Sequence, residues 1–159
     1  MKTAVPESLR LEQFLPYRLS VLSNVVSAAI ASAYRQRHGL TIPEWRVVAV
    51  LARYPGLSAR EVAEKTRMDA VAVSRAVTRL LRARRLRRAT AEEDRRRSIL
   101  SLSEQGMAVY REVVPFALGY ENSLLAALRP AERRMLDEIL DKLTDRAQRL
   151  DASPTVERS

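Results

Sequence analysis

The side chains best suited to binding a partner are arginines crowded into one part of the chain. Between Thr66 and Arg97 there are eleven arginines and four acidic residues, so this segment carries +7 of the net charge of +9. Such a basic concentration attracts polyanions, because each phosphate contact releases condensed counterions. A solvated charged surface normally mixes both signs. The segment therefore favours nucleic acid as its partner over a merely solvated face or an anionic membrane.

The chain has no cysteine and only one histidine, His38. Disulfides, thiolate zinc sites and a cysteine nucleophile are therefore excluded. A Ser-His-Asp arrangement would have to use His38, whose neighbours Arg35, Arg37 and Gly39 form no nucleophile elbow. We expect no enzymatic activity, no metal and no cofactor.

Length and composition indicate one compact domain or one small module carried on helical arms. Hydrophobic residues make up 47% of the 159 residues. No apolar run approaches the roughly 20 residues that a membrane span needs. The N-terminus has Lys2 followed by Pro6 and Glu7 rather than an apolar signal core. We expect a cytoplasmic protein that does not enter a membrane.

The elements before the basic segment are predicted to be helices. Apolar residues recur at helical spacing from Leu15 to Ala33, which predicts one long helix from about Ser8 to His38, ended by Gly39. Thr41-x-x-Glu44 is a capping box with Pro43 in the first turn, so a second helix should run to about Arg53. This second helix is expected to bury Trp45, Val48 and Leu51.

Two shorter helices should follow a turn at Pro55-Gly56. The capping box Ser58-x-x-Glu61 predicts a helix that ends near Arg67, and Asp69 can cap another helix over residues 70–84. On this helix one face is apolar, with Val73, Val77, Leu80 and Leu81, and the opposite face carries Arg75, Thr78, Arg79 and Arg82. One face should pack and the other should meet a partner.

The pattern then changes to two short strands and two long helices. Leu86–Thr90 and Ser98–Leu102 read as strands of a wing with the charged run 91–97 at its tip. Ser103 should cap a helix through about Leu128, and Pro130 should begin a last helix to about Leu150. The tail from residue 151 is expected to be disordered.

The order of elements predicts a mainly α fold with a small β-wing, a winged helix-turn-helix flanked by terminal dimerisation helices. Arginines on the second helix of such a motif can donate two hydrogen bonds to guanine in the major groove. Arg75 and Arg79 are best placed for this, and Arg82 and Arg84 for phosphate. The candidate DNA-contacting set is Ser58, Arg60, Ala70, Val71, Ser74, Arg75, Thr78, Arg79, Arg82, Asp94, Arg95, Arg96 and Arg97. Solvated surface arginines are the alternative interpretation.

Four segments resemble blocks of the multiple antibiotic resistance regulator (MarR) family, in the same order. They are Thr41-Ile-Pro-Glu-Trp45, Ser58-Ala-Arg-Glu-Val-Ala63, Met68-Asp-Ala-Val-Ala-Val-Ser-Arg-Ala-Val-Thr-Arg-Leu80 and Asp94-Arg-Arg-Arg-Ser-Ile-Leu-Ser-Leu-Ser-Glu-Gln-Gly106. The last block is the most specific. The resemblance implies that Asp94 and Arg96 shape the wing and that Arg95 or Arg97 enters the minor groove.

One segment departs from the family pattern. Where the family commonly has Arg-Gly-Leu, this chain reads Arg84-Arg85-Leu86. A non-glycine residue must therefore make the turn between the fourth helix and the wing. Glycine tolerates positive φ, and arginine does so only at a cost in free energy.

The resemblance also implies a homodimer, and the sequence agrees. The terminal helices carry more apolar side chains than a small module can cover: Val113, Phe116, Leu124, Leu125, Leu128, Met135, Ile139, Leu143 and Leu150. A monomeric helical hairpin is the alternative. The expected parts are residues 1–40 and 104–150 for dimerisation, 41–103 for DNA binding, and 151–159 as the tail.

Family members commonly bind small aromatic acids or related lipophilic anions. Candidate lining residues are Ser20, Asn24, Ser27, Arg35, His38, Trp45 and Arg46. Each also has an ordinary structural interpretation: a solvated helix end, a core tryptophan or close helix packing. We expect a ligand-responsive transcription regulator, a repressor that binds a pseudo-palindromic operator and is released by such an anion. The alternatives are a non-specific nucleoid-like or RNA-binding basic protein, and a small helical enzyme.

Overall fold

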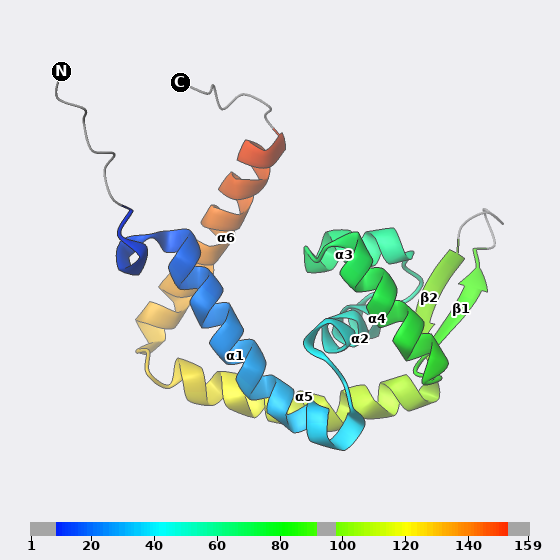
Figure 1. Cartoon of the computed structure of the whole chain (residues 1–159). Helices are drawn as coiled ribbons and strands as arrows, with labels where there is room; N and C mark the ends of the chain where they lie inside the picture. Colours follow the sequence, from blue (N-terminus) through cyan, green and yellow to red (C-terminus); the bar gives the residue numbers. More distant parts are fainter. Residues whose placement is uncertain (1–8, 92–97, 153–159) are drawn as a thin grey trace. The chain divides into compact units, whose positions relative to one another are not determined.

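The computed structural model describes residues 9–91 and 98–152. Within these residues the chain forms six α-helices, a short 3-10 helix and one two-stranded antiparallel sheet (Figure 1). The elements are η1 (Leu11–Gln13), α1 (Leu15–His38), α2 (Ile42–Arg53), α3 (Ala59–Thr66), α4 (Ala70–Arg82), β1 (Leu86–Thr90), β2 (Ser98–Leu102), α5 (Glu104–Leu125) and α6 (Pro130–Ala152). They belong to two compact units, Met1–Ala117 and Leu118–Ser159. The predicted fold class, a mainly α chain with a winged helix-turn-helix, is confirmed.

The long N-terminal helix begins later than the sequence predicts. The prediction started it at about Ser8, but α1 begins at Leu15, with Pro16 in its first turn, and Leu11–Gln13 is a separate 3-10 helix. Proline has no N–H and its ring clashes with the carbonyl four residues earlier, so the first turn is the position where a helix tolerates it best. The end of α1 is as predicted, since Gly39 has φ 63° and its N–H donates to the Arg35 carbonyl.

Both predicted capping boxes are present. The Glu44 carboxylate accepts from the Thr41 N–H at 2.7 Å, and the Thr41 hydroxyl accepts from the Glu44 N–H at 3.4 Å. The Ser58 and Glu61 pair repeats this pattern at 2.7 and 3.3 Å. These bonds satisfy N–H groups that have no partner inside the helix. They also explain how Glu44 can be buried at 5% exposure.

Helix α4 starts where predicted, and ends two residues earlier than predicted. The Asp69 carboxylate accepts from the Val71 and Ala72 N–H groups at its start. At its end the Arg84 N–H donates to the Leu81 carbonyl and the Arg85 N–H to the Leu80 carbonyl, which is a Schellman motif. Arg84 takes the left-handed conformation with φ 55°, so the helix cannot continue through it.

The two predicted strands are confirmed with the same limits. They pair antiparallel, with Leu86 opposite Leu102 and Thr90 opposite Ser98. Leu57 adds a bridge to Leu100, whose N–H donates to the Leu57 carbonyl at 2.8 Å. This bridge ties the turn after α2 to the sheet. The tip of the predicted wing, residues 92–97, lies outside the described residues.

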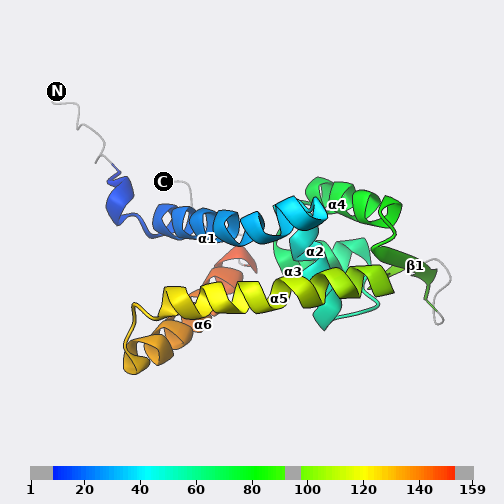
Figure 2. The same cartoon turned by 90° about the horizontal axis from the view of Figure 1, so that it is seen from below.

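Among the described residues, the buried core lies in the first unit and joins the end of α1, helices α2 to α4, both strands and the start of α5. Figure 2 shows the arrangement of these helices from below. Its buried members are Ala31, Tyr34, Leu40, Val47, Val48, Leu51, Val62, Val73, Ala76, Val77, Leu80, Leu86, Leu100, Val109 and Val113. Trp45 and Leu81 were expected to be buried, but they are only partly buried at its edge. Val113 was assigned to an exposed arm, yet it is part of the core.

The last two helices differ from prediction only at their ends. Helix α5 stops at Leu125 rather than Leu128. Residues 126–128 form a turn in which hydrogen bonds join residues three apart, such as the Leu128 N–H to the Leu125 carbonyl. Pro130 follows, and the residue before a proline is disfavoured in helical conformation. Helix α6 reaches Ala152, so the tail predicted from residue 151 begins no earlier than 153, beyond the described residues.

Candidate nucleic-acid interface

The face of α4 that the sequence assigns to a partner is open. Ser74, Arg75, Thr78, Arg79 and Arg82 are all exposed, whereas Val73, Ala76, Val77 and Leu80 are buried against the core. Within the described ranges, no hydrogen-bond acceptor or carboxylate engages the guanidinium groups of the three arginines. Five donors on each guanidinium therefore remain available for bases and phosphates. Thr78 differs, because its hydroxyl already donates to the Ser74 carbonyl at 2.9 Å.

The other candidate contacts surround this face. Ala70 and Val71 form the exposed first turn of α4, with Val71 at 56% exposure. Arg60 on α3 forms an exposed ion pair with Glu64, its Nε lying 3.0 Å from the carboxylate. The Ser58 hydroxyl is occupied in the capping box. Asp94, Arg95, Arg96 and Arg97 lie outside the described residues.

A hollow of about 350 Å³ lies beside the open face of α4. Its walls come from the first turn of α2 and from α4: Thr41, Pro43, Glu44, Ala72, Arg75, Ala76 and Arg79. No local sequence pattern predicts this hollow, because it depends on how α2 crosses α4. Arg75 and Arg79 therefore border both solvent and a partly apolar depression.

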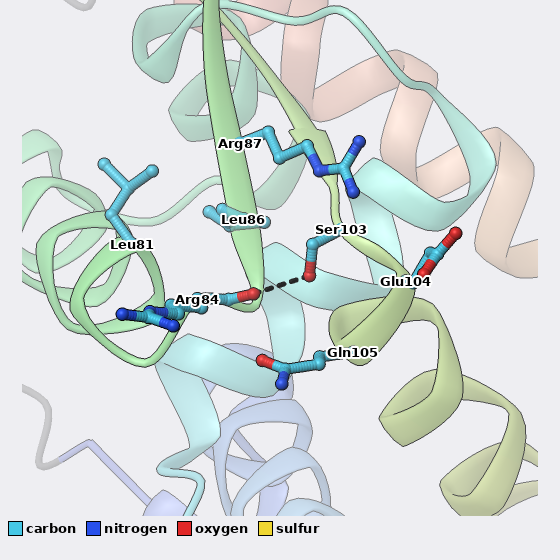
Figure 3. A pocket seen from close by; sticks show the side chains of 7 residues that line it. All are labelled: Leu81, Arg84, Leu86, Arg87, Ser103, Glu104 and Gln105. Carbon is cyan, nitrogen blue, oxygen red and sulfur yellow. Dashed lines mark hydrogen bonds between the residues drawn. The ribbon is translucent and has the colours of Figure 1, made fainter.

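A second hollow, of about 430 Å³, lies where α4, β1 and the start of α5 meet. Its lining includes Leu81, Arg84, Arg87 and Glu104 (Figure 3). At its floor the Ser103 hydroxyl donates to the Arg84 carbonyl at 2.6 Å and accepts from the Gly106 N–H at 3.0 Å. These bonds join the end of α4 to the first turn of α5.

The candidate ligand-binding residues are only partly brought together. Trp45 lies between two tyrosine rings, with centroids 5.5 Å from Tyr34 and 6.0 Å from Tyr110. Burial raises the pKa of Tyr34, and the charges of Arg35 and Arg46 oppose this rise. The Arg46 guanidinium donates to the Ser27 hydroxyl at 3.4 Å, which joins α2 to α1.

The remaining candidates are placed separately. His38 Nε2 lies 3.2 Å from the Glu112 carboxylate on α5. Ser20, Asn24 and Arg35 are exposed on α1. Tyr34, Tyr110 and Glu112 were missed by sequence reasoning, since they join segments far apart in the chain. Only the helical phase of Tyr34, three residues after the buried Ala31, could have indicated it.

The comparisons with known proteins agree with this geometry. The MarR family model matches residues 38–97, which include the helix-turn-helix and β1. The HTH-type transcriptional regulator BilQ of Clostridium symbiosum is 28% identical over 108 residues, covering 68% of this chain and 75% of its own. A MarR/EmrR family transcriptional regulator from Acinetobacter sp. ADP1 superposes with a TM-score of 0.81 at 26% identity, over 89% of this chain and 99% of that one.

The family that this chain resembles is thus the MarR family, most directly over residues 38–97. Its winged helix-turn-helix fold is that of transcription regulators, and the relatives that it resembles are transcription regulators. BpsR of Bordetella bronchiseptica, whose DNA binding is regulated by 6-hydroxynicotinic acid, matches with a TM-score of 0.75 at 24% identity, over 87% of this chain and 99% of its own. At that identity the match supports the MarR fold alone.

Two further features of the described residues bear on other functions. None of the helices there is long and apolar enough to cross a membrane. No group of three or more histidine, aspartate or glutamate side chains in the same residues could hold a metal ion.

Proposed function

We propose that the chain is a ligand-responsive repressor that binds a pseudo-palindromic DNA site as a homodimer. The observation that carries the proposal is the open face of α4, where three arginines point away from the core with no ionic partner among the described residues. A surface arginine that only solubilises a helix is normally accompanied by acids at i±4. Here the face offers donors to a polyanion.

Different arginines should have different roles on DNA. Arg75 and Arg79 are one turn apart on the open face of α4, so both can face base edges and donate paired hydrogen bonds to guanine. Arg82 is in the last turn and is better placed for phosphate. The family resemblance further implies that Arg95 or Arg97 enters the minor groove and that Asp94 and Arg96 shape the wing.

The exposed apolar residues of the arms support the homodimer. Leu15, Leu19 and Leu22 on α1 are 45%, 42% and 53% exposed, and Met135, Ile139 and Leu143 on α6 are 60%, 44% and 40% exposed. Apolar surface of this extent on helices normally marks an interface. In this proposal residues 1–40 and 104–150 form the dimer, and residues 41–103 form the DNA-binding module.

The effector is proposed to be a hydrophobic anion, an aromatic carboxylate or its derivative, bound beside Trp45 where α1 meets α2. Arg46 supplies a cation there and Ser27 a hydroxyl. Tyr34 and Tyr110 both stack on the Trp45 ring, so a flat ligand must contact the part of the ring that they leave free or displace one of them. The regulation of BpsR by 6-hydroxynicotinic acid supports this ligand class.

Release of DNA by such a ligand follows from linkage. A ligand shifts the equilibrium only if it binds the DNA-incompetent arrangement more tightly. Its affinity must therefore fall in the presence of operator DNA, by the same factor by which it weakens the DNA complex. Arg46→Ala should lower the affinity for ligand more than His38→Ala, because His38 is already paired with Glu112.

The test is a footprint on the DNA that flanks the protein's own gene, together with the mass of the particle in solution. We expect a protected palindromic site whose half-sites lie about 34 Å apart, and a dimer at micromolar concentration. An 18 kDa particle, or protection that random DNA removes as efficiently as the site itself, would instead favour the non-specific basic protein.

For the effector, 6-hydroxynicotinic acid and other aromatic acids are titrated into free and DNA-bound protein. The proposed pocket predicts that Arg46→Ala weakens both ligand binding and DNA release. A ligand whose binding and DNA release are unchanged in Arg46→Ala and His38→Ala would show that the pocket is elsewhere. The candidates Ser20, Asn24, Ser27, Arg35 and Trp45 would then keep only structural roles.

A further inference from the structure

The turn that departs from the family pattern holds a residue with an unusual set of contacts. Arg85 is only half-buried, yet its backbone is bonded on both sides. Its N–H donates to the Leu80 carbonyl at 2.9 Å, which closes α4, and its carbonyl accepts from the Ser103 N–H at 3.0 Å. The backbone of Arg85 therefore lies at the junction of α4, the base of the wing and α5.

The side chain of Arg85 leaves this junction and reaches the end of α1. Its Nη2 donates to the His38 carbonyl at 2.5 Å, across 47 residues of sequence. His38 is the last residue of α1, so its carbonyl has no partner within the helix, and a cation at this end is favoured by the helix dipole. The His38 ring meanwhile contacts Glu112 on α5 at 3.2 Å.

We propose that Arg85 is a positioning residue, which fixes the angle of α4 and the wing relative to α1. The inference rests on the proposed function, because α1 is there a dimerisation helix. The angle between α1 and α4 then determines the separation of the two recognition helices in the dimer. Arg85 thereby sets the spacing of the DNA half-sites that the dimer accepts.

Charge alone does not account for this arginine. Arg84 and Arg87, its neighbours on the same turn and strand, are exposed and have no side-chain partner within the described part of the chain. The Arg85 guanidinium instead donates a hydrogen bond to a neutral backbone carbonyl of the protein itself. A residue that served only to attract DNA would leave those donors in solvent.

The first experiment measures spacing selectivity, defined as the ratio of affinities for the operator and for an operator with one base pair inserted between its half-sites. Arg85→Met removes the contact, and Arg85→Lys keeps the charge without the planar fork. We expect Arg85→Met to lower the ratio by about two- to thirtyfold, and Arg85→Lys to retain more of it. Arg87→Met is the control for lost charge, and it should weaken both complexes equally and leave the ratio unchanged.

The second experiment does not depend on DNA. Because the chain has no cysteine, Ala59→Cys on α3 gives one nitroxide label per protomer. The distance between the two labels in the dimer should be narrowly distributed in the otherwise wild-type protein, broad in Arg85→Met and intermediate in Arg85→Lys. In Arg87→Met, the distribution of label-to-label distances should be as narrow as in the wild-type protein.

Unchanged spacing ratio and unchanged label width in folded dimers of Arg85→Met would overturn the proposal. If Arg85→Met does not fold, Arg85→Lys decides by the same two measurements. A wild-type protein that is monomeric, or that ignores the inserted base pair, contradicts the proposed function itself. If the wild-type dimer distinguishes the two operator spacings and the Arg85 variants distinguish them equally well, only the role of Arg85 is contradicted.

Discussion

The DNA-binding module and the terminal helices differ in how far their side chains are buried within one chain. In the module, helices α2, α3 and α4 each begin at a capping residue. Ten of the fifteen buried apolar core residues lie in the module, and the other five come from the adjoining residues 31–40 and 109–113. In α6, none of the side chains described for residues 130–151 is buried. The module thus completes its packing within one chain, and the arms do not. Substitutions should therefore act on folding in the module and on association in the arms.

The largest expected effect is at the seam between the module and α5. A Cβ added to Gly106 would lie 2.0 Å from the Arg85 carbonyl oxygen, which is backbone held by the Ser103 N–H. Gly106→Ala must therefore push α5 away from the wing, and we expect a loss of about 3 kcal/mol or more in the free energy of unfolding. Chemical denaturation followed by circular dichroism measures it.

Gly119→Ala is the matched control on the same helix. No atom lies within 4 Å of a Cβ added there. Alanine is favoured over glycine in a helix, so this variant should gain up to about 1 kcal/mol. Equal destabilisation by the two substitutions would mean that helix propensity, and not the contact with Arg85, governs α5.

The sequence predicted the elements of the module better than its long-range contacts. Capping boxes and strand limits depend on residues close in the chain, and both were placed correctly from Thr41, Ser58 and the 86–102 alternation. The start of α1 was missed because the predicted helix was extended back to Ser8, whereas Pro16 favours a helix that begins at Leu15. The Tyr34–Trp45–Tyr110 stack joins three helices, so no local pattern could reveal it.

The site was predictable only in part, for the same reason. The open face of α4 follows from helical phase, which places Arg75 and Arg79 opposite Val73 and Val77. The engagement of His38 by Glu112 depends on how α1 meets α5, and the hollow beside Arg75 depends on how α2 crosses α4. Tertiary packing, and not residue type, decides which candidates remain free for a ligand.

In the arms, a charge placed on the apolar face should break association without unfolding the module. Ile139 is 44% exposed on α6, and Ile139→Glu should weaken the proposed dimer by about 2 kcal/mol or more. Sedimentation across a concentration series measures the dissociation constant. Gln148→Glu adds the same charge on the opposite side of α6 and should leave the dimer intact. If both variants dissociate equally, the effect is general repulsion and the apolar face is not the interface.

The next effect concerns DNA and separates roles within the module. Arg75→Ala should cost about 1–3 kcal/mol on the specific site and relax base preference there. Arg82→Ala removes the same charge nearer the end of α4, and should weaken operator and random DNA about equally. Fluorescence anisotropy with operator and with random DNA gives, for each variant, the ratio of its two affinities. Equal losses on operator and random DNA for Arg75→Ala would show that α4 does not read bases.

The smallest expected effect concerns the turn between α4 and β1. It tests whether the left-handed conformation of Arg84 lowers the free energy of unfolding of the module. Arg84 has φ 55°, a conformation that costs an L-residue about 1–2 kcal/mol and glycine almost nothing. Glycine is also more flexible when unfolded, so Arg84→Gly should gain a net of about 0.5–1 kcal/mol in unfolding free energy. At the preceding residue the backbone is right-handed, with φ −77°, and Ala83→Gly should instead lose up to about 1 kcal/mol.

Because Arg84 also supplies a cation beside the DNA-binding face, the same Arg84→Gly variant should bind DNA more weakly at low salt. Higher stability together with weaker DNA binding would show that this turn keeps a strained arginine for its charge, whereas a lower melting temperature would show that φ 55° carries no strain.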